Sequence, residues 1–522
     1  MFEREESAVK CPYLYSLILV CGASSVCAAH DLPLALRQVS TTQVEGGVEI
    51  VVFDESSRLL HAIGASGRMV FGIDEDGHPI LQSTHVFSGT QAWEATSIAI
   101  DPLGRGFGVV SWIPDPTDSV PGFAQVIDLE SGLPVWQFSI GYHPDCVMFT
   151  PDGRYLLAAN ECEPRATDRA GGITVAELTG INKASDFVGY NEAVTYELTE
   201  AHLGPDVDLG VLRIAPGFEE TPGVNTEPEY IAATNAGAWV SLQENNGLGY
   251  FDLVQRRWTR VQPLGMLSFA FDGSETDGTT LTSGEGFGLL PMPDTIASYT
   301  QEGRDYLVLA NEGEKSDEHS MRLGDAIEAG LVDAHAVKRL EQSVGDLEAS
   351  GYDRLFVSTI DGDLDADGDL DVLCPLGGRS VSIMDAQSGR VVWNSGPQIE
   401  LISGMLFPER YNAGDSRSDR AGPEPEGVAV TMIEGHTLMS IGLERVDAVM
   451  LYDITNPFAP ELLDVQALSD GCQSPEGLHF FSYDERHFLA VAGEIGGCLT
   501  IYEIAPPAHE KPTPDGVGSE SR

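Results

Sequence analysis

Residues 475–494 read PEGLHFFSYDERHFLAVAGE, and residues 425–444 read PEGVAVTMIEGHTLMSIGLE. Both stretches open with a proline and an acid, continue as an apolar-rich run, turn, and continue as a second such run that ends in an acid. Stretches with the same plan begin at Pro144, Pro228 and Pro293. Two apolar-rich runs joined by a turn predict an antiparallel pair of β-strands. Self-similar units that recur about every 40 residues indicate a propeller or a solenoid.

Short strands, 57 glycines and few helical patterns favour an all-β propeller over a solenoid or a sandwich. Weaker units of the same kind occupy residues 48–73 and 96–128. A further segment of strands over residues 355–393 completes the unit that begins at Pro293. Counting these units gives seven blades, so the expected fold is a seven-bladed β-propeller over residues 30–505.

Three segments depart from the strand pattern. Apolar residues recur at roughly helical spacing within residues 318–350, which predicts a helical insert in the fifth blade. Residues 1–29 contain an apolar run followed by small residues and predict a signal peptide. Residues 506–522, rich in Pro, Ser and Glu, predict a flexible tail. No later stretch approaches the roughly 18 consecutive apolar residues of a membrane-spanning helix, and we expect an exported, soluble monomer.

The formal net charge is −52, from 29 Lys and Arg against 81 Asp and Glu. A charge of this sign repels phosphates, so it argues against sequence-independent binding of nucleic acid. Cations are therefore the ligands to look for.

The acids that open and close each repeat lie 15 to 18 residues apart. An antiparallel pair of strands places both acids at the same end of the hairpin. Because the first strand of a propeller blade is innermost, these acids are expected to converge at one mouth of the central channel, where oxygen ligands suit Ca²⁺, Mg²⁺ or Mn²⁺. The alternative is that they cap backbone amides or pair with arginines between blades. The ten candidates are Asp145, Glu161, Glu229, Glu244, Asp294, Glu312, Glu426, Glu444, Glu476 and Glu494.

A second candidate metal site is the aspartate-rich segment 361–371, which reads DGDLDADGDLD. Alternate aspartates followed by Gly368 match the first half of a calcium loop, although Cys374 stands where an EF-hand has its bidentate glutamate. We expect Ca²⁺ here in a mainly structural role, with a solvated acidic turn as the alternative. The candidate ligands are Asp363, Asp365, Asp367, Asp369 and Asp371.

Four cysteines lie at the ends of two hairpins. Cys146 faces Cys162 across one hairpin, and Cys472 faces Cys498 across the other. Two disulfides are one interpretation, and free buried thiols are the other. His143 precedes the acid of its repeat by two positions. It is a candidate acid, base or ligand at the channel mouth, or else a structural residue at a blade edge.

Several stretches together resemble the choice-of-anchor I family of secreted and surface β-propeller proteins. They are distributed over a span of about residues 45–504, nearly the whole mature chain. They are residues 144–145, 149–155, 159–161, 227–232, 241–246, 291–294, 310–313, 377–380, 416–419, 422–427, 442–445 and 474–478. The resemblance implies a seven-bladed propeller of the YVTN or quinoprotein-like type that is exported and often tethered through a C-terminal anchor.

The chain contains no GxSxG, HExxH, P-loop or GxGxxG motif. The leading hypothesis is therefore a calcium-stabilised binding or adhesion module that is secreted, periplasmic or on the cell surface. The alternative is a metal-dependent phosphoesterase, similar in general logic to propeller phosphatases of the alkaline-phosphatase type, in which ring acids hold a second divalent metal and Arg417 and Arg445 clamp phosphate. A quinoprotein-like dehydrogenase ranks last, because the expected cofactor ligands are not recognisable.

Overall fold

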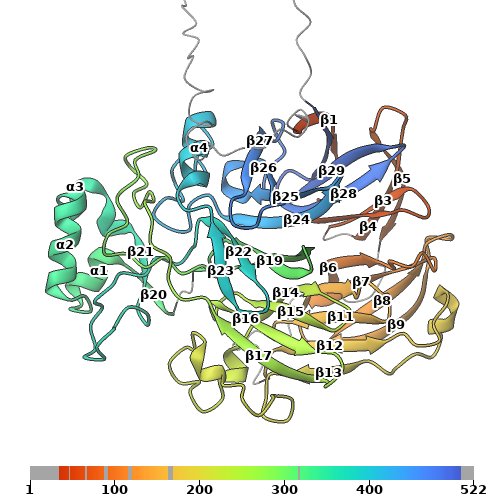
Figure 1. Ribbon diagram of the computed structural model, residues 1–522, viewed down its shortest axis with the longest axis horizontal. Coiled ribbons are helices and arrows are strands. Elements are labelled where there is room, and N and C mark those ends of the chain that lie inside the picture. The colour runs from red at the N-terminus through yellow and green to blue at the C-terminus, as the bar shows by residue number, and fades with distance from the viewer. Residues whose placement is uncertain are drawn as a thin grey trace, which may run out of the picture. The chain divides into compact units, whose positions relative to one another are not determined.

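Seven four-stranded sheets make up the chain from Leu34 to Ala505 in the computed structural model (Figure 1). The structure describes residues 34–506 except for 46, 65–66, 87–91, 116–119, 163–168 and 316–317. The predicted signal peptide lies outside the described residues, as does the predicted tail beyond Pro506. The seven sheets confirm the predicted seven-bladed β-propeller.

The first four blades each use four consecutive strands. The first contains β2 Ile50–Asp54, β3 Leu59–Gly64, β4 Gly67–Ile73 and β5 Pro79–Val86. The second contains β6 Ala92–Ile100, β7 Phe107–Asp115, β8 Gly122–Asp128 and β9 Pro134–Gly141. The third contains β10 Pro144–Phe149, β11 Tyr155–Asn160, β12 Gly172–Glu177 and β13 Val194–Glu197. The fourth contains β14 Pro228–Ala233, β15 Gly237–Leu242, β16 Gly247–Asp252 and β17 Arg257–Pro263.

The last three blades include the two departures from this order. The fifth contains β18 Ile296–Gln301, β19 Arg304–Asn311, β22 Ser380–Asp385 and β23 Arg390–Asn394. The sixth contains β24 Pro425–Ile433, β25 His436–Leu443, β26 Ala448–Asp453 and β27 Glu461–Ala467. The seventh contains β28 Pro475–Tyr483, β29 Arg486–Gly493, β30 Cys498–Ala505 and, from the start of the described chain, β1 Ala35–Gln43.

The first strands of the blades form a closed ring. In order β2, β6, β10, β14, β18, β24 and β28 each contact the next, and β28 contacts β2. The seventh blade joins the two ends of the propeller, because β1 pairs antiparallel with β30 from Ala35 opposite Ala505 to Gln43 opposite Cys498. The repeat pattern did not predict β1, since this strand stands alone and has no second strand beside it in the sequence.

The middle strands of the blades are buried on both faces. Every residue of β11, β15 and β22 is buried, whereas the outer strand β5 is largely exposed. Blades that pack face to face cover both sides of their middle strands, which explains why these strands read as continuous apolar runs without polar alternation.

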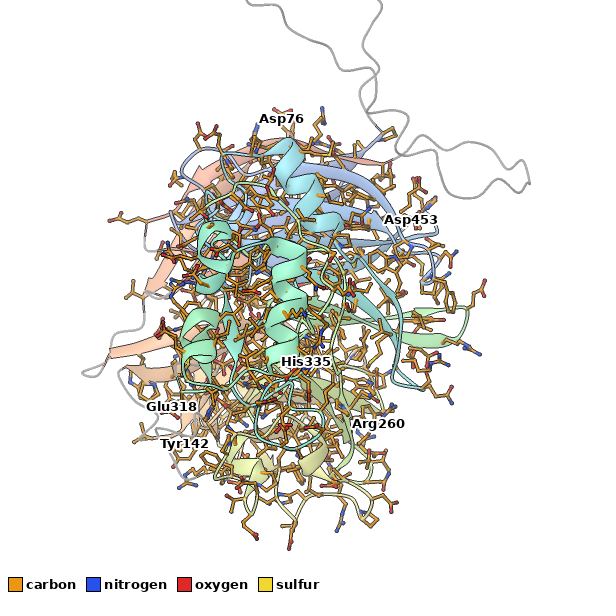
Figure 2. All side chains as sticks on the ribbon, turned by 90° about the vertical axis from the view of Figure 1, so that its left-hand side faces the viewer. Asp76, Tyr142, Arg260, Glu318, His335 and Asp453 are labelled. Atoms are coloured by element: carbon orange, nitrogen blue, oxygen red, sulfur yellow. A yellow bond between two sulfur atoms is a disulfide. The ribbon has the colours of Figure 1, made fainter. Side chains whose placement is uncertain are left out.

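The insert in the fifth blade lies between β19 and β22. It contains β20 Ser320–Arg322, α1 Leu323–Glu328, α2 Ala334–Val344, α3 Leu347–Ser350 and β21 Phe356–Ser358. Its helices pack around a core of their own that includes Phe271, Leu323, Leu340 and Tyr352. Figure 2 shows α2, with the labelled His335, facing the viewer. The predicted helical insert is thus confirmed. Strand β21 lies within the segment of strands expected over residues 355–393, but it pairs with β20 and not with the fifth blade. No helix within the described residues is long and apolar enough to cross a membrane.

Each of the two interpretations of the cysteines holds for one hairpin. Cys472 and Cys498 form a disulfide with Cα atoms 5.6 Å apart, whereas Cys146 and Cys162 are buried thiols with no bridge between them. The register of the strands explains why these two thiols are not bridged. Cys146 lies opposite Ala159, and Cys162 lies beyond the end of β11, where its thiol donates to the backbone carbonyl of Tyr142.

A fully buried ion pair ties the fifth blade to helix α4 (Gln398–Leu406), which the sequence patterns did not predict. The Nη1 of Arg379 lies 2.9 Å from Oε1 of Glu400, and both side chains have no exposed surface. The same guanidinium donates to the backbone carbonyls of Asp272, Ser418 and Arg420. One side chain therefore joins four segments that are far apart in the sequence.

Replacing Cys472 and Cys498 together by serine should lower the free energy of unfolding by about 3 to 4 kcal/mol. The bridge closes a loop with a sequence separation of 26, and its loss releases conformational entropy in the unfolded chain. Denaturant unfolding checks this value. A reductant should destabilise the parent chain and leave the double variant unaffected; an equal response of both proteins would contradict the prediction.

Replacing Arg379 by methionine should lower the free energy of unfolding by about 3 to 5 kcal/mol, because Glu400 is left as an uncompensated buried charge. The double variant Arg379→Met with Glu400→Leu should recover part of this loss. Arg58→Met is the matched control, since Arg58 pairs with Asp484 on the surface, and it should change stability by less than about 1 kcal/mol. Equal losses of stability for Arg379→Met and Arg58→Met would contradict the predicted contribution of the buried Arg379–Glu400 pair.

Candidate functional site

The opening acids of four repeats lie in β-bulges at the start of the first strand. The register shifts occur between Pro144 and Cys146, Pro228 and Ile231, Pro425 and Val428, and Pro475 and Leu478. Asp145, Glu229, Glu426 and Glu476 occupy these shifted stretches. A bulged residue leaves the ladder of hydrogen bonds and its side chain is re-aimed. In these four blades the Pro-acid motif therefore marks the place where the inner strand turns a carboxylate out of the sheet.

The glycine of the Pro-Glu-Gly motif allows neighbouring inner strands to approach closely. A Cβ atom on Gly427 would collide with the backbone carbonyl of Glu476, and one on Gly477 would collide with that of Glu49. Only glycine fits at such close contacts between backbones. These contacts bring the backbone at Glu476 close to Gly427 of the preceding blade and to Glu49 before the first blade.

These acids line a cavity of about 300 Å³, which we call the mouth cavity. Eight of its eleven lining residues are acidic, and none of the described lining residues is basic. Each of the seven inner strands contributes a residue in its bulge or just before its start. The lining residues are Glu49, Thr96, Asp145, Glu229, Tyr230, Gln243, Asp294, Glu312, Glu314, Glu426 and Glu476.

Burial and mutual repulsion disfavour the charged forms of these carboxyls. Burial raises the pKa of Glu229 well above its usual value, and the neighbouring carboxylates of Glu161 and Asp145 raise it further. Burial likewise raises the pKa of Asp294 to about 7. The same two causes raise the pKa values of Glu312, Glu426 and Glu476 well above the usual range. Such a site gains stability from protons or from a bound cation.

The acids that close the repeats do not behave as one set. Glu312 lines the mouth cavity, whereas Glu494 is exposed to solvent. Burial raises the pKa of Glu244, with Glu227 as the strongest charged neighbour. Burial also raises the pKa of Glu444 to about 8. The predicted ring of ten acids is therefore divided between the cavity and its surroundings.

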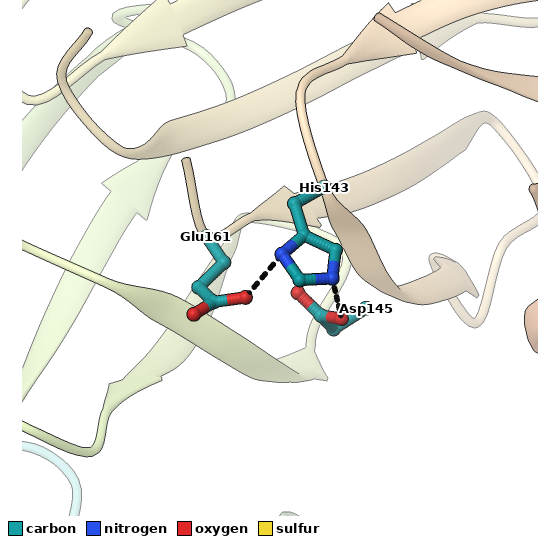
Figure 3. Close-up of side chains that lie close together, drawn as sticks. All are labelled: His143, Asp145 and Glu161. Atoms are coloured by element: carbon teal, nitrogen blue, oxygen red, sulfur yellow. Dashed lines mark ion pairs between the residues drawn. The ribbon is translucent and has the colours of Figure 1, made fainter. Parts of the chain in front are cut away.

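His143 turns toward two of the predicted acids (Figure 3). Its Nδ1 lies 2.6 Å from Oε2 of Glu161, and its Nε2 lies 3.9 Å from Oδ1 of Asp145. One ligand atom from each of the three residues falls within 4.8 Å of the others. This triad combines imidazole and carboxylate donors and opens onto the cavity through Asp145. A similar grouping without histidine joins Asp294, Glu312 and Glu426.

The two arginines predicted to clamp an anion both hold a buried carboxylate. The Nε of Arg417 donates to Oε1 of Glu424 over 2.8 Å, and the Nε of Arg445 donates to Oε2 over 2.6 Å. The side chain of Glu424 is only 2% exposed. Arg445 also pairs with Glu444 at 2.6 Å. The pairing of arginine with repeat acids, considered as the alternative for the whole set, thus applies to Glu444.

The aspartate-rich loop lies in the insert, and the structure brings three of its five predicted ligands together. Carboxylate oxygens of Asp363, Asp365 and Asp371 lie within 4.8 Å of one another. Asp363 accepts hydrogen bonds from the backbone amides of Asp367 and Gly368, as expected for a tight turn. Asp369 is not part of this group.

Sequence reasoning missed Glu49, Thr96, Glu314 and Glu424. The first two precede or interrupt the inner strands of blades one and two, which lack the Pro-acid opening. A signal for Glu49 was present, since it directly precedes the apolar run of β2. Glu424 lies one position before the Pro-Glu pair of its repeat, where the pattern gave no reason to single it out.

Replacing Glu426 by glutamine should stabilise the chelator-treated protein at pH 9 and have little effect at pH 5. Folding raises the pKa of Glu426 above its value in the unfolded chain. The stability linked to this shift is fully present below the unfolded pKa and is lost as the pH rises through the folded pKa. The amide of the Glu426→Gln variant does not ionise, so this stability is not lost at pH 9. Melting temperatures at both pH values provide the test, with the exposed Glu494→Gln as the matched control. A gain that is equal for both variants would argue against repulsion within the cavity.

Comparisons with known proteins place this geometry in a family. The model of the choice-of-anchor I domain matches residues 49–457. The mesenchyme-specific cell surface glycoprotein of Strongylocentrotus purpuratus is 25% identical over 284 residues, which make up 47% of this chain and 36% of that protein. Gigasin-3a of Magallana gigas is 31% identical over 114 residues, 20% of this chain and 40% of that protein.

Both matches cover well under two thirds of these relatives. A solved structure of streptogramin B lyase aligns with 91% of this chain and 98% of its own at 9% identity and a TM-score of 0.44. Because the matching domain covers more than half of the sequence, the chain belongs to the choice-of-anchor I family.

Proposed function

We propose that this protein is an extracellular or cell-surface binding module whose propeller mouth holds a divalent cation. The observation that carries the proposal is the composition of the mouth cavity, in which eight acidic side chains converge without a basic one among the described lining residues. Carboxylates that line one small, partly buried cavity repel one another strongly. A divalent cation offsets this repulsion and turns an unfavourable cluster into a ligand shell.

The donor chemistry selects the class of metal. Asp294, Glu312 and Glu426 offer oxygen atoms alone, the donors preferred by Ca²⁺, Mg²⁺ and Mn²⁺. The triad around His143 adds a nitrogen donor, which suits a transition ion such as Mn²⁺ or Zn²⁺. The cavity thus has a calcium-type group and, beside it, a group suited to a second divalent metal.

Calcium in the aspartate-rich loop has a structural role in this proposal. Mutual repulsion with Asp367 raises the pKa of Asp365, and a bound cation removes this repulsion. The loop is tied to the insert, because the backbone carbonyl of Asp371 accepts a hydrogen bond from Arg339 of α2. Calcium here stiffens the insert, and this role is separate from that of the cation at the mouth cavity.

The family and the named relatives support an external location. The resemblance to the choice-of-anchor I family implies exported proteins that are often tethered, the family model matches residues 49–457, and the Strongylocentrotus purpuratus relative is named as a cell surface glycoprotein. The disulfide between Cys472 and Cys498 fits an oxidising compartment. The phosphoesterase alternative requires Arg417 and Arg445 to clamp a phosphate at the mouth cavity, but neither arginine lines that cavity.

Titration with Ca²⁺, followed by calorimetry and by melting temperature, tests the proposal. The parent protein should bind Ca²⁺ at two kinds of site. Glu426→Gln should weaken binding at the mouth, and Asp363→Asn with Asp365→Asn should remove binding at the loop. Free Ca²⁺ at about 100 times its Kd should stabilise the fold by about 2.7 kcal/mol. Glu494→Gln, exposed and outside the cavity, is the control.

Absence of binding heat together with an unchanged melting temperature in chelator would refute the cation-dependent module. Loss of only the loop site, with Glu426→Gln binding like the parent, would limit calcium to its structural role and contradict the assignment of the mouth.

A further inference from the structure

A second cavity, of about 230 Å³, lies beside the mouth cavity and, unlike it, has basic residues in its lining. Four basic and three acidic side chains line it, and the ring of Phe356 forms part of its wall. We call it the basic pocket. Its lining residues are Glu312, Gly313, Glu314, Lys315, Phe356, Leu376, Arg417, Arg420, Ala421, Glu424 and Arg445.

Basic residues are scarce in this chain, so four of them around one pocket are unusual. The sequence has 29 basic residues against 81 acidic ones. The four come from distant segments, with Lys315 after β19, Arg417 and Arg420 before β24, and Arg445 after β25. No repeat spacing unites them, so the fold itself assembles the pocket.

Buried carboxylates hold the arginines in place. Glu424, almost fully buried, accepts from both Arg417 and Arg445. The buried Asp419 lies 3.6 Å from Nε of Arg420. A guanidinium carries five N–H donors. Arg417 uses Nε and Nη2 on Glu424, and Arg445 uses Nε on Glu424 and Nη1 on Glu444, so each keeps further donors for a ligand. Such anchoring limits the entropy lost when an anion binds.

Phe356 supplies a flat wall against which cations lie. The Nζ of Lys315 is 5.0 Å from the ring centroid, and the Cζ atoms of Arg420 and Arg322 are 5.7 Å and 4.5 Å from it. Contacts of this kind orient the charged groups, and Leu376 and Ala421 add apolar surface to the wall of the pocket. The pocket therefore offers both charge and a face for a small carbon skeleton.

We propose that the basic pocket binds the anionic group of a small ligand or of a side group on a larger one: a carboxylate, a sulfate ester or a phosphate ester. Forked N–H donors match the oxygen geometry of all three. The strongly negative net charge does not forbid this, because charges beyond the Debye length of about 8 Å are screened at physiological ionic strength. The pocket is a site for anions within an acidic protein and does not require a metal.

Glu312 and Glu314 line both cavities. A cation at the mouth would neutralise these shared acids and reduce their repulsion of an anion next door. Binding of a cation and binding of an anion should therefore strengthen each other, and linkage requires the two effects to be equal. This coupling is the one part of the inference that rests on the proposed cation site.

The experiment uses the full chain, with sodium sulfate, sodium phosphate and sodium D-glucuronate as probes and D-glucose as the uncharged control. Calorimetry in chelator at constant ionic strength measures anion binding without any cation. Sulfate and glucuronate are then repeated in Ca²⁺. Preference for glucuronate indicates a carboxylate ligand, and preference for sulfate or phosphate indicates a tetrahedral ester.

Lys315→Gln and Arg420→Gln, singly and together, should weaken anion binding about tenfold or more each, since each removes a charge-assisted contact. Both side chains are partly exposed, so folding should be retained. Arg410→Gln is the control, because Arg410 lines a different cavity. Binding that is lost only in the pocket variants supports the inference, and tighter binding in Ca²⁺ supports the coupling.

Lack of anion binding in both conditions would overturn the inference, as would equal binding by the pocket variants or equal weakening by Arg410→Gln. Anion binding in chelator with no effect of Ca²⁺ would overturn the coupling and leave the pocket assigned. Failure of the cation site is thus distinguished from failure of the basic pocket.

Discussion

The pairing of β1 with β30 is the constraint on which the site depends. Ala35 to Gln43 complete the seventh blade, so the first and last strands of the propeller lie in one sheet and the ring of inner strands cannot open without breaking it. A closed ring fixes the starts of all seven inner strands at one mouth. Side chains from Glu49 to Glu476, more than four hundred positions apart in sequence, therefore share one cavity. Without closure the acids would separate and their repulsion would relax.

The repulsion among the acids of the mouth cavity opposes folding, and the packing of the blades offsets it. Their middle strands are buried on both faces, and the Arg379–Glu400 pair and the Cys472–Cys498 bridge fasten segments around them. A bulge is also a small local disturbance, because it removes one residue from the ladder while the neighbouring pairs continue. The acids are thus mounted on rigid strands at little loss of backbone pairing. Rigid mounting of an unfavourable charge cluster is the arrangement expected of a site prepared for a ligand of opposite charge.

The repeat made the blades and most of the mouth predictable, because a regular spacing maps onto a regular position in the ring. Asp145, Glu229 and Glu476 were found in this way. Features that do not repeat could not be predicted from the sequence. Strand β1 has no repeated partner in the sequence, and Glu49 lacks the preceding proline. The choice between a bridge and buried thiols at Cys146 and Cys162 stayed open for a related reason, since an ideal hairpin register ignores the bulge that aims Asp145 into the cavity. The irregularity that forms the site is the one that misleads a prediction from regular spacing.

The net charge of the chain is a poor guide to the ligands of the mouth cavity and an even poorer guide to those of the basic pocket. An acidic composition argues against anionic partners as an average over the surface, but the field in a cavity depends on the few charges that line it. Glu424 adds a negative charge to the total and yet creates the positive site, because it holds Arg417 and Arg445 side by side. The acids thus have two roles, according to whether a base is within reach. At the mouth they meet one another and favour a cation; a few residues away they position arginines and favour an anion. Glu312, on the wall between the two cavities, is where these opposite fields meet.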